Sequence, residues 1–167
     1  MDHRVKNLFA LAGSVVTLSA RSAKTSEELS VAVRGRLAAL AQAHVLTLGD
    51  ASESDRRTQP STTLHRLIET ILSPYDGQTD EDRARISITG PDIPSAGSSA
   101  TSFALLLYEF ATNATKHGAL STSSGYTDIA CSADDDQVIL TWTERRVRLL
   151  TIIPTLRALA LSSHAQR

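Results

Sequence analysis

The hydrophobic pattern of residues 103–121 predicts an amphipathic helix. Apolar side chains recur there at helical spacing and form one stripe suited to packing on a core: Phe103, Leu106, Leu107, Phe110, Ala111 and Ala114. Glu109, Asn113 and Lys116 follow one another by four and three residues, so they share a second, polar face. Gly118 predicts the helix end, in the left-handed conformation that glycine adopts readily.

Two earlier helices are predicted, at residues 2–22 and 25–48. In the first, apolar residues step by three and four and form a short coiled-coil-like seam: Val5, Leu8, Ala12 and Val15. The second opens with the string TSEE at residues 25–28, which matches a capping box. The short link makes the two helices antiparallel neighbours. Because two such helices cannot bury both of their faces alone, the pattern predicts that a second copy completes a four-helix bundle.

The remainder predicts a domain of mixed helices and strands. The polar segment 49–62 predicts a linker, and a short helix around residues 64–72 follows it, ending before Pro74. Strands are expected at 84–90, 125–132 and 137–142, and the turn-forming ADDD string joins the last two into a hairpin. The fold class is therefore α+β. The predicted domain ranges are a helical hairpin at 1–50, a second domain at 60–144 and a divergent tail at 145–167.

Composition limits the function classes. The formal net charge of the 167 residues is -1, which gives no reason to expect a nucleic-acid partner. No apolar run approaches the ~20 residues that a membrane helix needs, so no membrane association is expected. The single cysteine, Cys131, cannot form an internal disulfide and fits a reducing cytoplasm.

The polar face of the 103–121 helix suits a metal-bound polyphosphate. The amide oxygen of Asn113 is a hard, neutral ligand of the kind that magnesium prefers. Lys116 supplies a point charge for phosphate, and Glu109 can orient a metal-bound water or act as a base. From spacing alone, a solvated helix face with an ordinary charge pair is the favoured alternative.

Three short sequence strings, found in the same order as in a known family, favour the phosphate-binding interpretation over the solvated helix face. FATNATKHGALS at 110–121 resembles the N box of sensor histidine kinases, above all of the HWE family. HRVKNLF at 3–9 resembles that family's phosphoacceptor box, and Trp142-Thr143-Glu144 stands where the family has its Trp-x-Glu. The histidine that the family has just before the N-box acid is Tyr108 here, which is a departure. The resemblance covers about residues 1–144.

The resemblance implies a two-component histidine kinase, with a phosphotransfer hairpin followed by a sandwich-like ATP-binding domain. His3 would accept phosphate from ATP and pass it to an aspartate of a response regulator, and Glu109 would assist catalytically. Asn113 would bind Mg²⁺, and Lys116 and His117 would contact the nucleotide. Glu144 would stand near the acid that receives the adenine amino group. The implied partners are a second copy, as a homodimer through the hairpin, and a response-regulator receiver domain.

The two ends depart from the family pattern. Glycine-rich strings are expected after the Trp-x-Glu, because backbone amides must approach the phosphates closely, yet the last glycine is Gly125. We interpret the tail as the product of a shifted reading frame or a truncation; the alternative is a terminal strand plus a basic helix covering the sheet edge. Only two residues precede His3, which suggests a fragment or an internal start; the alternative is an acceptor on a fraying first turn of the helix.

Two other function classes stay open. One is a degenerate kinase-like dimer that relays phosphate on His3 without using ATP. The other is a purely structural helical dimer with a vestigial sheet domain.

Overall fold

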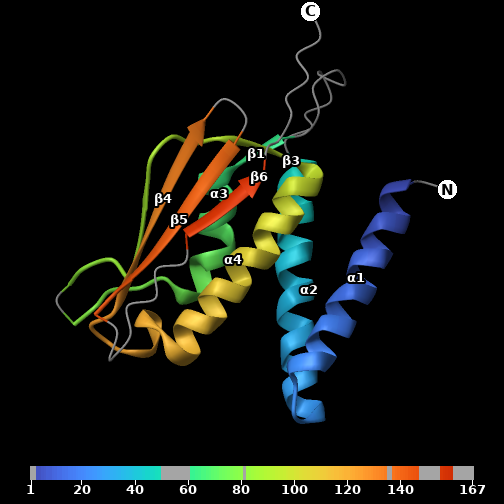
Figure 1. Ribbon diagram of the computed structural model, residues 1–167, viewed down its shortest axis with the longest axis horizontal. Helices are drawn as coiled ribbons and strands as arrows, with labels where there is room; N and C mark the ends of the chain where they lie inside the picture. Colours follow the sequence, from blue (N-terminus) through green and yellow to red (C-terminus); the bar gives the residue numbers. More distant parts are fainter. Residues whose placement is uncertain (1–2, 50–60, 81, 135–136, 147–154, 160–167) are drawn as a thin grey trace, which may run out of the picture.

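The fold is a helical hairpin joined to a helix-and-sheet unit (Figure 1). This computed structural model describes residues 3–49, 61–80, 82–134, 137–146 and 155–159. The helices are α1 (His3–Ser22), α2 (Ser26–Gly49), α3 (Leu64–Leu72) and α4 (Gly97–His117), with short 3-10 turns η1 (Ser73–Tyr75) and η2 (Ala119–Ser121). The strands are β1 (Ser61–Thr63), β2 (Ile86–Thr89), β3 (Pro94–Ala96), β4 (Tyr126–Asp134), β5 (Gln137–Arg145) and β6 (Thr155–Leu159). The predicted α+β class is confirmed.

Helices α1 and α2 form the predicted antiparallel hairpin. The capping box at the start of α2 is present: the Glu28 backbone N–H donates to Thr25 Oγ1 at 3.1 Å, and the Lys24 N–H donates to Glu28 Oε2 at 2.7 Å. The two helices are close at their connection and diverge toward His3 (Figure 1). In the described part of the chain, no helix is both long enough and apolar enough to cross a membrane.

The main sheet has four strands in the order β2-β4-β5-β6. The predicted hairpin of β4 and β5 is confirmed as an antiparallel pair, and β2 joins β4 in parallel. A second sheet pairs β1 with β3, which the sequence did not predict. Strand β1 lies at the end of the segment expected to be a linker, where Thr62 is buried opposite Ser95.

Helix α4 lies between the sheet and the hairpin, with α3 on the same side of the sheet (Figure 1). Its buried residues recur at helical spacing and include Leu107, Ala111 and Ala114. They share one core with the fully buried Trp142 of β5 and with Leu67 of α3. The apolar stripe that predicted this helix therefore faces the core as expected, although α4 begins at Gly97, before the predicted start.

The end of α4 and the tail correct two expectations. Gly118 has φ -110° and ψ -156°, so it is extended, and the predicted left-handed conformation is wrong. A side chain at Gly118 would overlap the Glu144 carboxylate, so close approach rather than backbone handedness requires glycine there. In the tail, Thr155–Leu159 forms β6 and pairs with β5 at the sheet edge, as the strand alternative expected. Residues 147–154 and 160–167 lie outside the described residues.

Close contact between α2 and α4 depends on Gly35. A Cβ at this position would overlap the ring and hydroxyl of Tyr108, so the missing side chain lets the tyrosine pack directly on the α2 backbone. A Cβ at Gly13 of α1 would meet none of the described residues within 4 Å, so this glycine serves as a matched comparison. Both glycines lie inside helices.

We predict that the same substitution has opposite effects at the two glycines. Gly13→Ala should raise the free energy of unfolding by about 0.5–1 kcal/mol through helix propensity. Gly35→Ala should lower it by about 1–3 kcal/mol, because Tyr108 must move. Urea denaturation followed by circular dichroism measures both. Adding Tyr108→Ala should turn the Gly35→Ala effect favourable, and a stabilising Gly35→Ala single variant would contradict the packing described here.

Candidate functional site

The outward side of α4 gathers the polar residues that the sequence singled out. Asn113, Lys116 and His117 are exposed, while the neighbouring Ala111 and Ala114 are buried and fix the orientation of the helix. At about 100° per residue, Asn113 lies about 40° around the helix from Glu109 and about 60° from Lys116. The predicted common face is therefore present. Glu109 and Lys116 are only about 20° apart around the helix, and Asn113 lies at one side of the face, between the other two along the helix axis.

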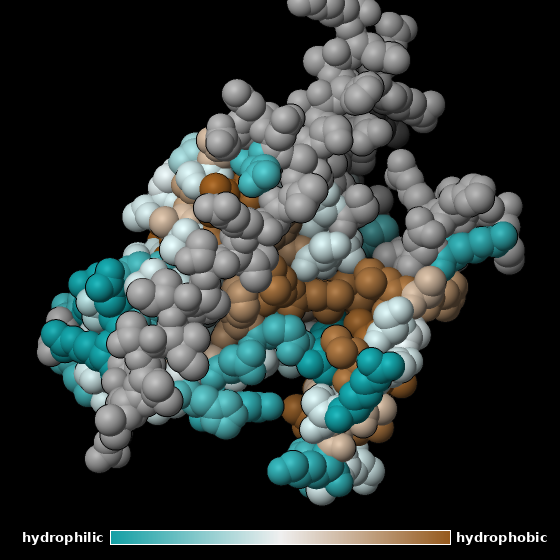
Figure 2. Space-filling view, in the orientation of Figure 1, coloured by the Kyte–Doolittle hydropathy of each residue, from teal (hydrophilic) through white to brown (hydrophobic). Residues whose placement is uncertain are grey.

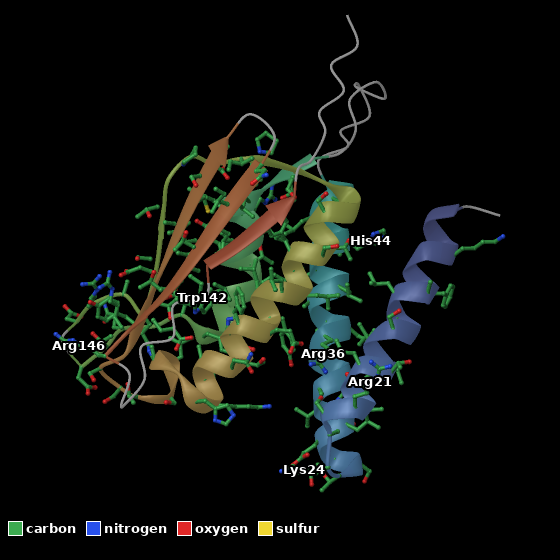
Figure 3. All side chains as sticks on the ribbon, in the orientation of Figure 1. Arg21, Lys24, Arg36, His44, Trp142 and Arg146 are labelled. Carbon is green, nitrogen blue, oxygen red and sulfur yellow. The ribbon has the colours of Figure 1, made fainter. Side chains whose placement is uncertain are left out.

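Glu109, however, is held by the hairpin. Arg36 of α2 binds the Glu109 carboxylate through two charge-assisted hydrogen bonds: Nε donates to Oε1 at 2.5 Å and Nη2 donates to Oε2 at 2.8 Å. The third nitrogen, Nη1, donates to Ser19 Oγ of α1 at 2.7 Å. The Arg36 side chain is 10% exposed and that of Glu109 is 33% exposed. A chain of polar contacts thus joins α1, α2 and α4 through one guanidinium (Figure 3).

This contact shifts the ionisation of its neighbours. The hydrogen bond to Glu109 raises the pKa of Arg36 above its ordinary value and keeps the guanidinium charged. Burial raises the pKa of the Tyr108 phenol, and the Glu109 charge raises it further. Tyr108 therefore stays protonated and serves as a packing residue beside the ion pair.

Glu144 is engaged at the other end of α4. Its Oε2 accepts the Ala119 backbone N–H at 2.6 Å, and its Oε1 accepts the Trp142 indole N–H at 3.2 Å. Trp142 is fully buried, and its ring lies 5.4 Å from that of Phe110, at an interplanar angle of 50°. Through these hydrogen bonds, the Trp-x-Glu residues join β5 to the end of α4, where Lys116 and His117 lie.

One buried polar atom near Glu144 has no partner among the residues that the structure describes. Thr127 of β4 pairs directly with Glu144 across the antiparallel strands and is 0% exposed, and no described residue forms a hydrogen bond with its Oγ1. A buried hydroxyl without a partner is costly, so this atom is available to a polar group of a ligand or to a water molecule. The polar atoms of Thr127 and Glu144 fit a donor and acceptor group such as the amino edge of a base.

The predicted phosphoacceptor is not brought to these residues. His3 is the first residue of α1, and its side chain lies outside the described residues. Across the described ranges, no group of three or more His, Cys, Asp or Glu side chains is arranged to hold a metal ion. A magnesium ion that takes one protein amide and otherwise phosphate and water oxygens does not need such a group.

Sequence reasoning missed Arg36 and Ser19. Arg36 falls between Val33 and Leu40 at spacings of three and four, so it lies in the apolar stripe of α2. A charge in that stripe signals a buried partner, because an unpaired buried charge is too costly to keep. That signal was present, but it did not identify Glu109, 73 residues away in sequence, as the partner.

Residues 1–92 match the HWE histidine kinase family, which is more than half of the chain. This chain belongs to the HWE histidine kinase family. It is 33% identical over 145 residues to blue-light-activated histidine kinase 1 of Erythrobacter litoralis, covering 87% of this chain and 38% of that protein. It is 34% identical over 125 residues to the blue-light-activated histidine kinase of Brucella anthropi, covering 75% of this chain and 23% of that protein. The chain therefore spans well under half the length of these relatives.

The solved histidine kinase domain of the Erythrobacter litoralis EL346 blue-light-activated kinase is also similar. It aligns with a TM-score of 0.45 at 15% identity and covers 81% of this chain and 71% of that domain. The roles of His3, Glu109, Asn113, Lys116, His117 and Glu144 stay predictions.

The engagement of Glu144 leads to a stability prediction. Glu144→Ala should lower the free energy of unfolding by about 1–3 kcal/mol, because the Ala119 and Trp142 N–H groups lose their acceptor. Glu144→Gln keeps one acceptor oxygen and should lose less. Urea unfolding followed by the fluorescence of Trp142, the single tryptophan, measures both. The exposed Glu69→Ala variant is the control, and equal stability of Glu144→Ala and Glu69→Ala would contradict the contact.

Proposed function

We propose that this chain is the kinase core of a two-component histidine kinase that transfers the γ-phosphoryl group of ATP to its own histidine and then to a response-regulator aspartate. The observation that carries this proposal is the outward face of α4, where Asn113 stands between Glu109 and Lys116 in a chain of the HWE family. The single cysteine and the use of ATP fit a cytoplasmic reaction.

In this proposal the chain's residues divide the work of phosphoryl transfer, which consists mostly of positioning and charge stabilisation. Lys116 and His117 would bind phosphate oxygens from the end of α4. Glu109 would accept the proton of the attacking imidazole or orient it. The His3 imidazole would be the nucleophile and the covalent carrier. The bond from the γ-phosphorus to the bridging oxygen breaks as the bond to the imidazole nitrogen forms, and ADP leaves with the electron pair.

The residues present fit a magnesium nucleotide. Asn113 would hold Mg²⁺, which when bound neutralises charge on the phosphate oxygens. Glu144 and the unpartnered Thr127 Oγ1 would meet the base beside the end of α4. Glu144 would then have to exchange its present hydrogen bond from Ala119 for one from the base.

The proposed partners are a second copy and a receiver domain. Large apolar side chains are exposed on both hairpin helices: Phe9, Val16 and Leu18 on α1, and Val31, Leu37 and Val45 on α2. Figure 2 shows apolar surface extending over α4 and α2 toward α1. A second hairpin would cover these side chains as a four-helix bundle. The aspartate of a receiver domain would then approach His3 at the open end of that bundle.

A phosphate relay on His3 that no longer uses ATP is the second candidate. It is favoured by the two acids of the site, since the oxygens of both Glu109 and Glu144 already accept hydrogen bonds from the chain itself. Nucleotide binding separates the two functions.

Titration calorimetry with magnesium-ATP tests the proposal. We expect saturable binding that Asn113→Ala weakens by roughly tenfold or more, since loss of a metal-site partner typically costs 10- to 100-fold. Removing magnesium with EDTA should weaken binding in the wild type much more than in Asn113→Ala. Gln42→Ala, which removes an exposed amide from α2, is the matched control.

The covalent step is tested by incubating the chain with radiolabelled ATP. Label should be acid-labile and should be lost in His3→Ala. A folded chain that binds no nucleotide at millimolar ATP would overturn the kinase proposal and favour the relay.

A further inference from the structure

The arrangement of α4 on the hairpin raises a geometric problem for the reaction proposed above. Glu109 lies against Arg36 and, through it, against Ser19 of α1. His3 is sixteen residues before Ser19 on the same straight helix, about 24 Å along its axis at about 1.5 Å per residue. The acid of α4 is therefore far from the phosphoacceptor of its own chain.

A second copy does not remove this distance. In a bundle whose two-fold axis runs along the helices, both His3 residues lie at the same end. The Arg36 contact lies toward the other end, near the connection of α1 to α2 (Figure 3). For Glu109 and the nucleotide to meet either histidine, α4 and the sheet must move along the hairpin, and the Arg36 contact must break.

We propose that Arg36 is a latch that holds the α4 unit in a resting position on the hairpin and restrains phosphorylation of His3. The inference rests on the function proposed above. The latch is the set of three hydrogen bonds from one guanidinium to Ser19 and Glu109. It can open without leaving a buried charge on α4, because Glu109 is one-third exposed and water can replace the guanidinium.

Beside the ion pair, the contact is close-packed, because Ala39 and Ala43 of α2 are buried in the core that α4 shares. Gly35, next to Arg36, brings Tyr108 onto the α2 backbone, one residue before Glu109. Ser19 keeps its own donor bond, since its Oγ donates to the Val15 carbonyl at 2.7 Å. Losing the arginine therefore leaves Ser19 with a hydrogen bond and leaves α1 intact.

Electron paramagnetic resonance distances test the latch without needing kinase activity. Spin labels are attached at two exposed positions, Ser30 on α2 and Ala130 on β4, after each is changed to cysteine (Ser30→Cys and Ala130→Cys). Cys131→Ala removes the native cysteine so that it is not labelled. We expect a narrow distance distribution in this background and a broad or shifted one after Arg36→Gln. Arg34→Gln, at an exposed arginine of the same helix, should leave the distribution narrow.

A charge reversal guards against simple misfolding. Arg36→Glu alone should broaden the distribution, and adding Glu109→Arg should narrow it again because the ion pair is restored with opposite orientation. An unchanged distribution in a folded Arg36→Gln variant would overturn the latch. So would broadening by Arg34→Gln as large as that by Arg36→Gln.

The restraint on catalysis is tested by initial rates of His3 phosphorylation with ATP. Arg36→Gln should raise the rate roughly fivefold or more, the lower end of typical coupling between sites, and Arg34→Gln should not. An unchanged or lower rate in Arg36→Gln would overturn the restraint. If neither wild type nor Arg36→Gln is phosphorylated and neither binds nucleotide, the kinase proposal fails, while the distances still decide whether the latch exists.

Discussion

The structure depends on helix α4 having three kinds of neighbour at once. One side buries Leu107, Ala111 and Ala114 in the core, another meets α2 through Tyr108 and Glu109, and the remaining strip is open to water. A helix has only 360° to divide, so the polar strip with Asn113 is bounded on one side by the hairpin contact and on the other by Phe110 and the sheet. A rearrangement at either boundary therefore changes the surroundings of this polar strip.

The two boundaries are built from different interactions, and this has consequences for motion. At the sheet, the buried Trp142 packs on Phe110, and such contacts are costly to separate. At the hairpin, the Arg36–Glu109 ion pair and Tyr108 lie beside the buried Ala39 and Ala43 of α2, whose small side chains bury little apolar area. Part-buried ion pairs orient their partners more than they stabilise them, since desolvation offsets much of the attraction. The α4 and sheet unit should therefore move as one body, and the hairpin contact should be the one that opens.

The sequence was sufficient for elements with a strong local signal. The helical stripe of α4, the capping box at Thr25 and the β4–β5 hairpin around ADDD all carry their information within a few residues. Strand β1 was missed because three residues give no periodicity and its partner β3 lies more than 30 residues away. The conformation of Gly118 was missed for a related reason: the local rule for a glycine after a helix was outweighed by Glu144, which arrives from another strand.

In the candidate site too, the sequence predicted which residues share a helix face but not which residues pair across elements. Spacing predicted that Glu109, Asn113 and Lys116 share a face, because one helix determines that. Spacing could not predict that Arg36 would reach Glu109, since this pair joins two units and depends on how they dock. The arginine in an apolar stripe was nevertheless a signal in itself: a helix keeps such a residue only where a partner compensates its charge. The acid that the family resemblance marked for chemistry is that partner, so the same carboxylate serves the docked arrangement and, in the proposed reaction, the transfer of phosphate. The Glu109 carboxylate cannot bind Arg36 and assist phosphate transfer at the same time. Its contact with Arg36 can therefore restrain the proposed reaction without a change in fold.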